Sequence, residues 1–578
     1  MREGREHTAS LRSDEKLKLP PEFTALKASF VDNYLESVAE YGVRFDEDLP
    51  HFKTTSGVHV GSDGVVTSPV AMWLEAVDLL FDRIARSEGG AALLRRQHAS
   101  VYWSAEAPAK LAALDPSRPL AAQLTDSTFT SPVSPNWQDS STTKECRDME
   151  HAVGGEEVMA HRTGSRANER FTGPQILKLR RTQPDVYDKT DRISLVSSFL
   201  TSIFCADGEI KPMEESDACG ANLWNLKADG LWDPELLEYV AGGKAEAAEL
   251  ERKLGQVEKD GGVAAGKIGR WFVERYGMDP DCLVNHFTGD NNATILSFSL
   301  HTGEVVVSLG TSDTILLSTT EYAPSPDSHV FSYPANRAGG GRSYMGMLCY
   351  KNGSLSREFV RDRYAEGSWE TFSRLVAEAG VPTVEAAETR PIGFYFLKHE
   401  IIPHNGYGVH HFEGAEETAV DDFSDPSFNA RAVLESQFLS FRHRMSNMLF
   451  SSTGLPVRIY AVGGASANQC IKDTLATVLA APVFQSGATS SSANSCSLGG
   501  CMKAYWAYAR LADPDLSFED AVHRARAALR RKRGEGAERE PLDRLVAEPD
   551  YGATLAYDKM MARLAELEKG VCTDVVER

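Results

Sequence analysis

The chain has 578 residues, of which 42% are hydrophobic and 25% charged, a composition that is ordinary for a folded globular protein. This length is too great for one hydrophobic core, so it predicts two large lobes. The formal net charge of −21 argues against nucleic acid or an anionic membrane surface as a partner. No apolar run approaches the roughly 20 residues that a transmembrane helix needs, and no membrane partner is expected.

The first residues and the cysteines indicate the compartment. The chain starts with a charged segment that lacks the apolar stretch of a secretory signal. Its nine cysteines are spread singly and show no CxxC spacing. This pattern predicts free thiols in a reducing compartment, and we expect the protein in the cytoplasm.

The N-terminal part predicts a short sheet and a helix. Residues 1–24 are charged and expected to be loose, whereas residues 24–45 alternate between apolar and polar in the manner of two strands. Ser68 is expected to cap a helix that has Pro69 in its first position. The apolar stripe that follows includes Trp73, which we assign to the core.

Several polar residues of the next segment have two interpretations. His98 could contact a polar ligand or satisfy a buried backbone group, and Asp139 could be only a helix cap. Arg166 and Arg170 lie near Glu169, and internal ion pairing explains these charges as well as ligand binding does.

Further along, residues 193–204 read as an apolar helix, and Asp217 in a polar turn is an additional candidate acid. The run from Gly261 to Lys267 has the spacing of a P-loop. However, Ile268 stands where that motif needs a magnesium-binding hydroxyl, and no apolar strand precedes it. We therefore reject a P-loop here.

The most informative segment is residues 289–318. An apolar strand over residues 305–309 leads into Gly310, Thr311 and Ser312, and a second strand follows over residues 314–317. Backbone N–H groups and two hydroxyls with little side-chain bulk can hold phosphate oxygens. One carboxylate, Asp290, precedes this turn between a glycine and two amides. A phosphate cradle beside one carboxylate suggests phosphoryl transfer to a hydroxyl, although such turns are often only hairpins.

The second half predicts several further elements. Residues 350–357 read as a turn that opens a helix, and a long amphipathic helix follows Asp425-Pro426 and runs to Leu449. His404, His410 and His411 lie in a broken loop, where a metal site is disfavoured because no carboxylate or cysteine shares their spacing.

Near the C-terminus, residues 459–479 read as strand, glycine turn and helix, an arrangement that suits the ribose or phosphates of a nucleotide. The basic run from Arg524 to Arg533 is interpreted as a solvated helix face.

Taken together and in this order, the motifs resemble the FGGY family of carbohydrate kinases, and within it the branch that acts on D-xylulose. The resemblance spans roughly residues 25 to 570. Its motifs are residues 68–73, 97–103, 139–143, 163–173, 193–199, 289–291, 308–313, 351–354 and 463–468. Each motif is weak alone, but the ordered set is specific.

The resemblance implies an α/β fold of two actin-like, ribonuclease-H-like lobes around a central ligand cleft. The N-terminal lobe would span residues 25–299 and bind sugar, and the C-terminal lobe would span residues 300–575 and bind nucleotide. The implied reaction is ATP-dependent, Mg²⁺-assisted phosphorylation of D-xylulose at its 5-hydroxyl, within pentose catabolism. If the lobes close on their ligands, the hinge should lie near residues 295–305.

Site residues carry over by position in the motifs. Asp290 matches the catalytic base, and His98, Arg170, Asp290 and Asn291 match sugar-contacting positions. Gly310, Thr311 and Ser312 match the loop on the transferring phosphates. Trp369, Gly464, Ala465 and Asn468 match nucleotide-contacting positions. No metal ligand and no oligomeric state can be assigned from the sequence.

Two segments depart from the family pattern. Members begin with a strand and a phosphate loop whose aspartate helps to hold Mg²⁺, whereas here residues 19–24 contain two prolines that disfavour that strand. Glu22 is the one carboxylate in that stretch, and nothing around it supports the same role. The segment before His98 is also shorter. Two alternatives therefore remain: a catalytically impaired relative that binds sugar or nucleotide, and a kinase for another ketose.

Overall fold

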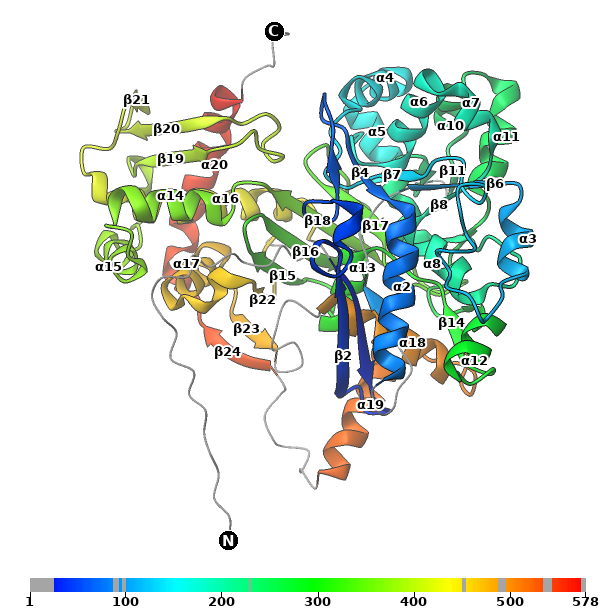
Figure 1. Ribbon diagram of the computed structural model, residues 1–578. Coiled ribbons are helices and arrows are strands. Elements are labelled where there is room, and N and C mark those ends of the chain that lie inside the picture. Colours follow the sequence, from blue (N-terminus) through cyan, green and yellow to red (C-terminus); the bar gives the residue numbers. More distant parts are fainter. Residues whose placement is uncertain are drawn as a thin grey trace.

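The computed structural model describes most of the chain. The described residues are 25–86, 93–95 (backbone path only), 100–227, 230–449, 454–486, 495–533 and 543–572. The expectations for residues 1–24 and for His98 lie outside them. The elements form two halves, drawn at the right and left of Figure 1, that meet along α13 (Asp290–Phe298) and the start of β15 (Glu304–Leu309).

One seven-stranded sheet organises the second half, in the order β17-β18-β16-β15-β22-β23-β24. The central strand β15 pairs antiparallel with β16 and parallel with β22. The other strands of this sheet are β16 (Asp313–Thr319), β17 (His329–Ser332), β18 (Tyr344–Tyr350), β22 (Arg458–Val462), β23 (Val483–Ser486) and β24 (Asp543–Ala547).

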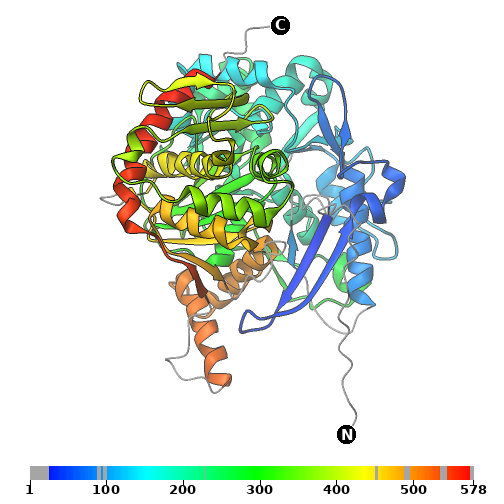
Figure 2. The ribbon, with the colours of Figure 1, turned by 90° about the vertical axis from the view of Figure 1, so that its left-hand side faces the viewer.

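Both faces of this sheet are buried, which explains the unbroken apolar run of β15. Successive side chains of a strand point to opposite faces, so Val305 and Val307 enter one core and Val306 enters another. The first core is completed by α14 (Ser354–Tyr364), α15 (Trp369–Ala379), α16 (Asn429–Ser446), α17 (Gln469–Leu479) and α20 (Thr554–Val571). Figure 2 looks onto this half, with α20 in red at its outer edge.

The opposite face of the sheet packs on the first half through α13. The ring centroids of Phe298 on α13 and Tyr460 on β22 are 5.6 Å apart. The short connection 299–303 then returns the chain from α13 into β15. The strands predicted at 305–309 and 314–317 are confirmed, and so are the strand, glycine turn and helix predicted over 459–479.

The long helix predicted after Pro426 is confirmed as α16, which begins at Asn429 and ends at Ser446, three residues before the predicted end. The turn predicted over 350–357 is confirmed, and α14 begins there at Ser354.

The first half begins with the sheet β2-β1-β5, in which β1 (Ala25–Val31) pairs antiparallel with β2 (Ser37–Arg44) and β5 (Leu93–Arg95). Both strands predicted over 24–45 are therefore confirmed, and a three-residue strand occupies the shortened segment before His98. Helix α2 (Val70–Ala85) packs on this sheet, and its Trp73 is buried as predicted.

The predicted cap of α2 is wrong. Ser68 lies in β4 (Val66–Pro69), where its backbone is in register with Ser134 of β7 (Val133–Pro135). Its buried hydroxyl donates to the Gly57 carbonyl 3.0 Å away, so it is turned away from the helix. Pro69 stands at the N-cap and the helix begins one residue later than predicted.

The helix predicted over 193–204 is partly wrong. Residues 193–195 end the strand β8 (Thr190–Leu195), which pairs antiparallel with β6 (Ser100–Ser104), and α8 (Val196–Cys205) begins after them. A strand partner that lies far away in the sequence has overridden the local apolar pattern here. The remaining longer helices of this half are α4 (Thr143–Val153), α5 (Glu156–Thr163), α6 (Thr172–Thr182), α10 (Pro234–Ala241), α11 (Lys244–Leu254) and α12 (Arg270–Tyr276).

One helix from the C-terminal part of the sequence packs on the first half of the molecule. Helix α18 (Ser495–Ala509) packs against α13 and β1. At Gly499 a Cβ atom would lie 1.7 Å from the Ala293 carbonyl oxygen, so only glycine permits this approach. The hydroxyls of Ser29 and Ser497 are 2.6 Å apart. Helix α18 therefore connects β1, α13 and the second half.

Two predictions from composition can be compared with the structure. All nine cysteines lie within the described residues and are free thiols, as predicted. Among the helices of the described ranges, none has the length and apolar character to cross a bilayer.

Candidate active site

The turn between β15 and β16 has the predicted geometry. Leu309 pairs with Asp313, so Gly310, Thr311 and Ser312 form the tip of a tight hairpin. Thr311 and Ser312 are exposed and Gly310 is half-buried. The tip therefore presents hydroxyls and backbone at the surface, although its phosphate-binding role stays a prediction.

A buried ion pair supports this turn from beneath. The Arg357 guanidinium of α14 donates to both carboxylate oxygens of Asp313, at 2.7 and 2.9 Å. The two side chains are 0% and 1% exposed. The Gly310 carbonyl accepts a 2.8 Å hydrogen bond from the backbone of Ser354, the first residue of the same helix. The start of α14 thus fixes both ends of the turn.

Asp290 is the first residue of α13, and Gly289 stands at the N-cap. Its half-buried carboxylate accepts a 2.8 Å hydrogen bond from the Asn291 backbone N–H. Helix α13 also contacts β16. The connection 299–303 turns the chain back from α13 into β15. The N-terminus of α13 and the Gly310 turn therefore lie toward the same side of the sheet, the side at which β15 ends.

Asp217 lies beside this helix start. A Cβ atom at Gly289 would be 2.8 Å from Asp217 Oδ1. The buried carboxylate of Asp217, on α9 (Glu215–Ala218), accepts a hydrogen bond from the Ser197 hydroxyl. The structure thus brings two carboxylates, Asp217 and Asp290, to the N-terminus of α13.

The two arginines before α6 have different surroundings. Arg166 forms ion pairs with Glu150 at 3.4 Å and Glu156 at 2.7 Å. Arg170 stacks over the Phe171 ring at 5.7 Å and makes no hydrogen bond or ion pair to any residue in the described ranges. Internal pairing therefore accounts for Arg166 only.

Arg170 lies close enough to the sheet of the second half to affect the pKa values of two residues in it. Burial raises the pKa of Cys349 on β18, and Arg170 opposes that rise. Burial, with a further contribution from Arg170, lowers the pKa of His329 on β17 to about 3. Arg170 thus lies where the first half meets β17 and β18.

A pocket of about 620 Å³ lies between α15 and α17, within the size range of small-molecule sites. Trp369 and Asn468 both line it. The Asn468 side-chain amide donates to the Ser373 hydroxyl at 3.0 Å, and its oxygen caps α17 by accepting from Ile471 N–H at 3.3 Å. The structure therefore brings together two of the four residues predicted to contact nucleotide.

Gly464 and Ala465 lie in the 3₁₀ turn that precedes α17, η5 (Gly464–Ala467), and they do not line this pocket. Gly463 before them has φ of +88°, and its added Cβ would be 2.5 Å from the Leu309 carbonyl oxygen. This glycine lets the turn of β22 approach the end of β15, next to Gly310.

Other predicted features have structural roles. Rejection of the P-loop is confirmed: residues 264–267 form the strand β13, and Lys267 pairs at the surface with Asp281 at 2.7 Å. A two-residue strand, β12 (Val257–Glu258), does precede this segment, contrary to expectation. Asp139 is not a helix cap, because Thr142 holds that position; Asp139 accepts from Val66 N–H and from the Gln175 amide, each at 2.8 Å.

The three histidines do not lie together in a loop as predicted. His410 and His411 are on the strand β20 (Gly408–Glu413), and His411 shares a 2.9 Å hydrogen bond with Asn429. The basic run forms the end of α19 (Phe518–Lys532) and is largely solvated. Arg526 is the exception, because burial lowers its pKa.

Two pairs of charged residues near this edge were missed by the sequence analysis. These are Arg357 with Asp313, and Lys503 with Glu214, whose charged atoms are 3.7 Å apart. An acid at the first position of a buried strand, such as Asp313, is a signal that could have indicated the first pair. Nothing local in the sequence indicates the second.

The chain is similar to known sugar kinases. Residues 305–508 match the C-terminal domain of the FGGY family of carbohydrate kinases. D-xylulose kinase A of Aspergillus niger is 41% identical over 525 residues, which cover 86% of this chain and 89% of that relative. A probable D-xylulose kinase A of Neosartorya fischeri is 42% identical over 525 residues, with the same coverage.

Solved structures of low sequence identity share the fold. Ligand-bound xylulose kinase from Lactobacillus acidophilus superposes with a TM-score of 0.70 at 16% identity and covers 96% of this chain and 97% of that one. Plasmodium falciparum glycerol kinase with ADP gives a TM-score of 0.68 at 12% identity and the same coverage. The predicted α/β fold of two actin-like lobes is thereby confirmed. The extent and identity of the sequence match show that the chain belongs to the FGGY family of carbohydrate kinases.

Proposed function

We propose that this chain transfers the γ-phosphoryl group of ATP to the 5-hydroxyl of D-xylulose. Its relatives at 41–42% identity are named for that sugar. The observation that carries the proposal is that Asp290 begins α13 and the Gly310 turn ends β15, the strand into which α13 leads. This arrangement supplies a carboxylate for the hydroxyl proton and uncharged donors for the phosphates.

On the sugar side, Asp290 acts as the general base, and Asn291, Arg170 and His98 bind the ketose. A neutral polyol is held by paired donors and acceptors. Arg170 supports this assignment because its guanidinium, which stacks on Phe171 but makes no hydrogen bond or ion pair within the described ranges, has donors available.

On the nucleotide side, Gly310, Thr311 and Ser312 hold the transferring phosphates. Trp369 and Asn468 contact the nucleoside from the pocket between α15 and α17, and Gly464 and Ala465 contact it through the adjoining turn. Catalysis then consists mainly of positioning and charge stabilisation.

Magnesium fits this edge as an ion that ATP brings with it. The described residues hold no group of three or more His, Cys, Asp or Glu side chains arranged around a metal. A magnesium ion on substrate phosphates needs only one or two carboxylates, because it keeps waters and phosphate oxygens as its other ligands. In this proposal Asp217, beside the N-terminus of α13, supplies such a carboxylate, and the ion would neutralise charge on the phosphates.

The proposed lobes are residues 25–299 and 300–575, with a hinge near residues 295–305. This division is supported by the sheets: the strands before α13 belong to other sheets, and β15 is the first strand of the seven-stranded sheet. Helix α18 crosses it, because this helix belongs to the second half in sequence and packs on α13. A hinge at 299–303 would therefore carry α18 along with the first lobe.

The alternative of a non-catalytic relative is not favoured, since the chain matches D-xylulose kinases over most of both lengths. The test is ADP release from MgATP with D-xylulose, D-ribulose, D-fructose and glycerol, with the product position assigned by NMR. We expect D-xylulose to give the highest kcat/KM, at least about tenfold above the others, and phosphate on the 5-hydroxyl. A higher kcat/KM for another substrate would refute the choice of sugar, and no turnover with any would refute the kinase.

A further inference from the structure

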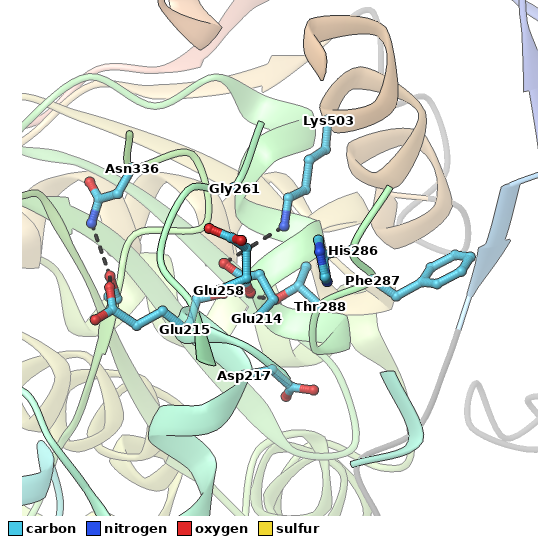
Figure 3. A network of polar contacts seen from close by, with 12 residues as sticks. Glu214, Glu215, Asp217, Glu258, Gly261, His286, Phe287, Thr288, Asn336 and Lys503 are labelled. Atoms are coloured by element: carbon cyan, nitrogen blue, oxygen red, sulfur yellow. Dashed lines mark hydrogen bonds and ion pairs between the residues drawn. The ribbon is translucent and has the colours of Figure 1, made fainter. Parts of the chain in front are cut away.

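A buried polar network includes Glu214, Lys503 and Thr288, and Thr288 lies in the loop that leads into α13 (Figure 3). Its cation is Lys503 of α18, which is 2% exposed and whose Nζ lies 3.7 Å from Glu214 Oε1. This ammonium makes no hydrogen bond to any residue in the described ranges. Glu214 belongs to β9 (Met213–Glu214) and is also 2% exposed.

Hydrogen bonds connect this pair to the loop before Asp290. The Ser216 hydroxyl donates to Glu214 Oε2, and it lies 2.8 Å from the Thr288 hydroxyl. Where Ser216 donates to Glu214, the hydrogen bond between Ser216 and Thr288 takes its proton from Thr288. Thr288 also contributes a hydrogen bond that lowers the pKa of Glu214. Thr288 stands two residues before Asp290, so an ordered chain of donors runs from this loop to the Lys503–Glu214 pair.

The direction of that chain depends on Glu214 being ionised. A carboxylate only accepts hydrogen bonds, whereas a protonated carboxyl can also donate and would allow the hydroxyls to reverse. Burial raises the pKa of Glu214, and Lys503 is the largest influence that lowers it. Burial in turn lowers the pKa of Lys503, and Glu214 is the largest influence that raises it, so each charge favours the ionised form of the other.

The other charged groups around Lys503 do not replace this role. His286 is buried and its pKa is lowered to about 4 by burial and by Lys503, so it is neutral at pH 7. Asp260 is already paired with Arg510, the residue that directly follows α18. Asp217 accepts from Ser197 at the start of α8.

A buried ion pair is a poor source of stability, because desolvation of both charges offsets their attraction. An ammonium without a hydrogen bond is poorer still. The pair does lie at the junction of α18, β9 and the loop that leads into α13. This placement suggests that the pair fixes the position of the loop that leads into α13 and Asp290.

We propose that Lys503 is a positioning residue, which acts through Glu214, Ser216 and Thr288 to hold Asp290 in place for proton abstraction. This inference rests on the proposed role of Asp290. It adds a residue that lies more than 200 positions after Asp290 in the sequence.

The test is a double-mutant cycle between Lys503→Met and Thr288→Val. Steady-state kinetics give kcat and both KM values, first with D-xylulose varied at saturating MgATP and then with MgATP varied at saturating D-xylulose. If Lys503 acts through Thr288, each single variant lowers kcat about tenfold or more while KM for ATP stays within about threefold. The double variant is then no worse than about twofold below the weaker single variant. Independent effects would multiply, and multiplication would overturn the proposal.

A second variant separates positioning from folding. Lys503→Met combined with Glu214→Gln leaves no unpaired charge, so its melting temperature should return close to that of the parent. Positioning predicts that kcat nonetheless stays low, since a carboxamide can donate as well as accept. Recovery of kcat together with the melting temperature would overturn the proposal and leave the pair a purely structural role.

Lys267→Met is the matched control, because that lysine is exposed and pairs only at the surface; its kcat should equal that of the parent. Absence of turnover in the parent would refute the proposed function itself. An active parent whose Lys503→Met variant stays within twofold in kcat would refute this inference alone.

Discussion

Replacement of Asp313 by asparagine removes one charge from the buried pair beneath the Gly310 turn. Arg357 would then remain charged at 0% exposure, with its hydrogen bond to Gln437 Oε1 at 2.8 Å but without an anion. Breaking a buried pair by removing one partner costs about 3–5 kcal/mol. Because Gln437 still accepts one bond, we expect the lower end, about 3 kcal/mol.

Thermal unfolding followed by circular dichroism measures this loss. For a lobe of this size, 1 kcal/mol shifts Tm by about 2–4 °C, so the variant should melt about 6–12 °C lower. KM for ATP should also rise, because the turn loses its support. The matched control is Arg374→Ala, which breaks an exposed pair with Glu378 (58% and 57% exposed) and should change stability by less than about 0.5 kcal/mol. A shift below about 2 °C for Asp313→Asn would refute the reasoning.

Three further predictions concern nucleotide binding, pH dependence and packing. Trp369→Ala and Asn468→Ala should each raise KM for ATP about 5–30-fold with KM for D-xylulose unchanged, since both residues line the pocket proposed for the nucleotide. An equal rise in both KM values in steady-state kinetics would contradict this assignment. Burial raises the pKa of Asp78 to about 6 from 3.8, so the folded state binds more protons than the unfolded state between these values. The free energy of unfolding should therefore fall by up to about 3 kcal/mol as pH rises from about 4 to 6. Urea titrations of Asp78→Asn should show no such dependence on pH, and an unchanged dependence would contradict the assignment to Asp78. Gly499→Ala would place a Cβ 1.7 Å from the Ala293 carbonyl oxygen. Thermal unfolding should show a loss of about 1–3 kcal/mol in the free energy of unfolding. A variant with the parental Tm would show that α18 and α13 are less closely packed.

The parts of the fold that the sequence predicts are those with strong local periodicity. The apolar run of β15, the stripe of α2 and the glycine turn before α17 each contain their own signal, and each is present in the structure. The ordered set of motifs identified the family for the same reason, since every motif is local.

What the sequence could not predict depends on contacts between distant segments. Residues 193–195 form a strand only because β6 pairs with them, and Ser68 turns its hydroxyl to Gly57 rather than to a helix. The approach of Lys503 to Glu214 requires α18 to return across the molecule, and no local pattern encodes that return.

The central claim is that Asp290 takes the proton of the D-xylulose hydroxyl during transfer from ATP. The most direct measurement is D-xylulose-dependent ADP release by the parent and by Asp290→Asn, with unfolding curves for both. We predict that the variant folds normally, keeps KM for ATP within about threefold and loses about 10²–10⁴ in kcat. A folded variant that turns over at the parental rate would contradict the assignment of Asp290, and a folded parent without turnover would contradict the kinase itself.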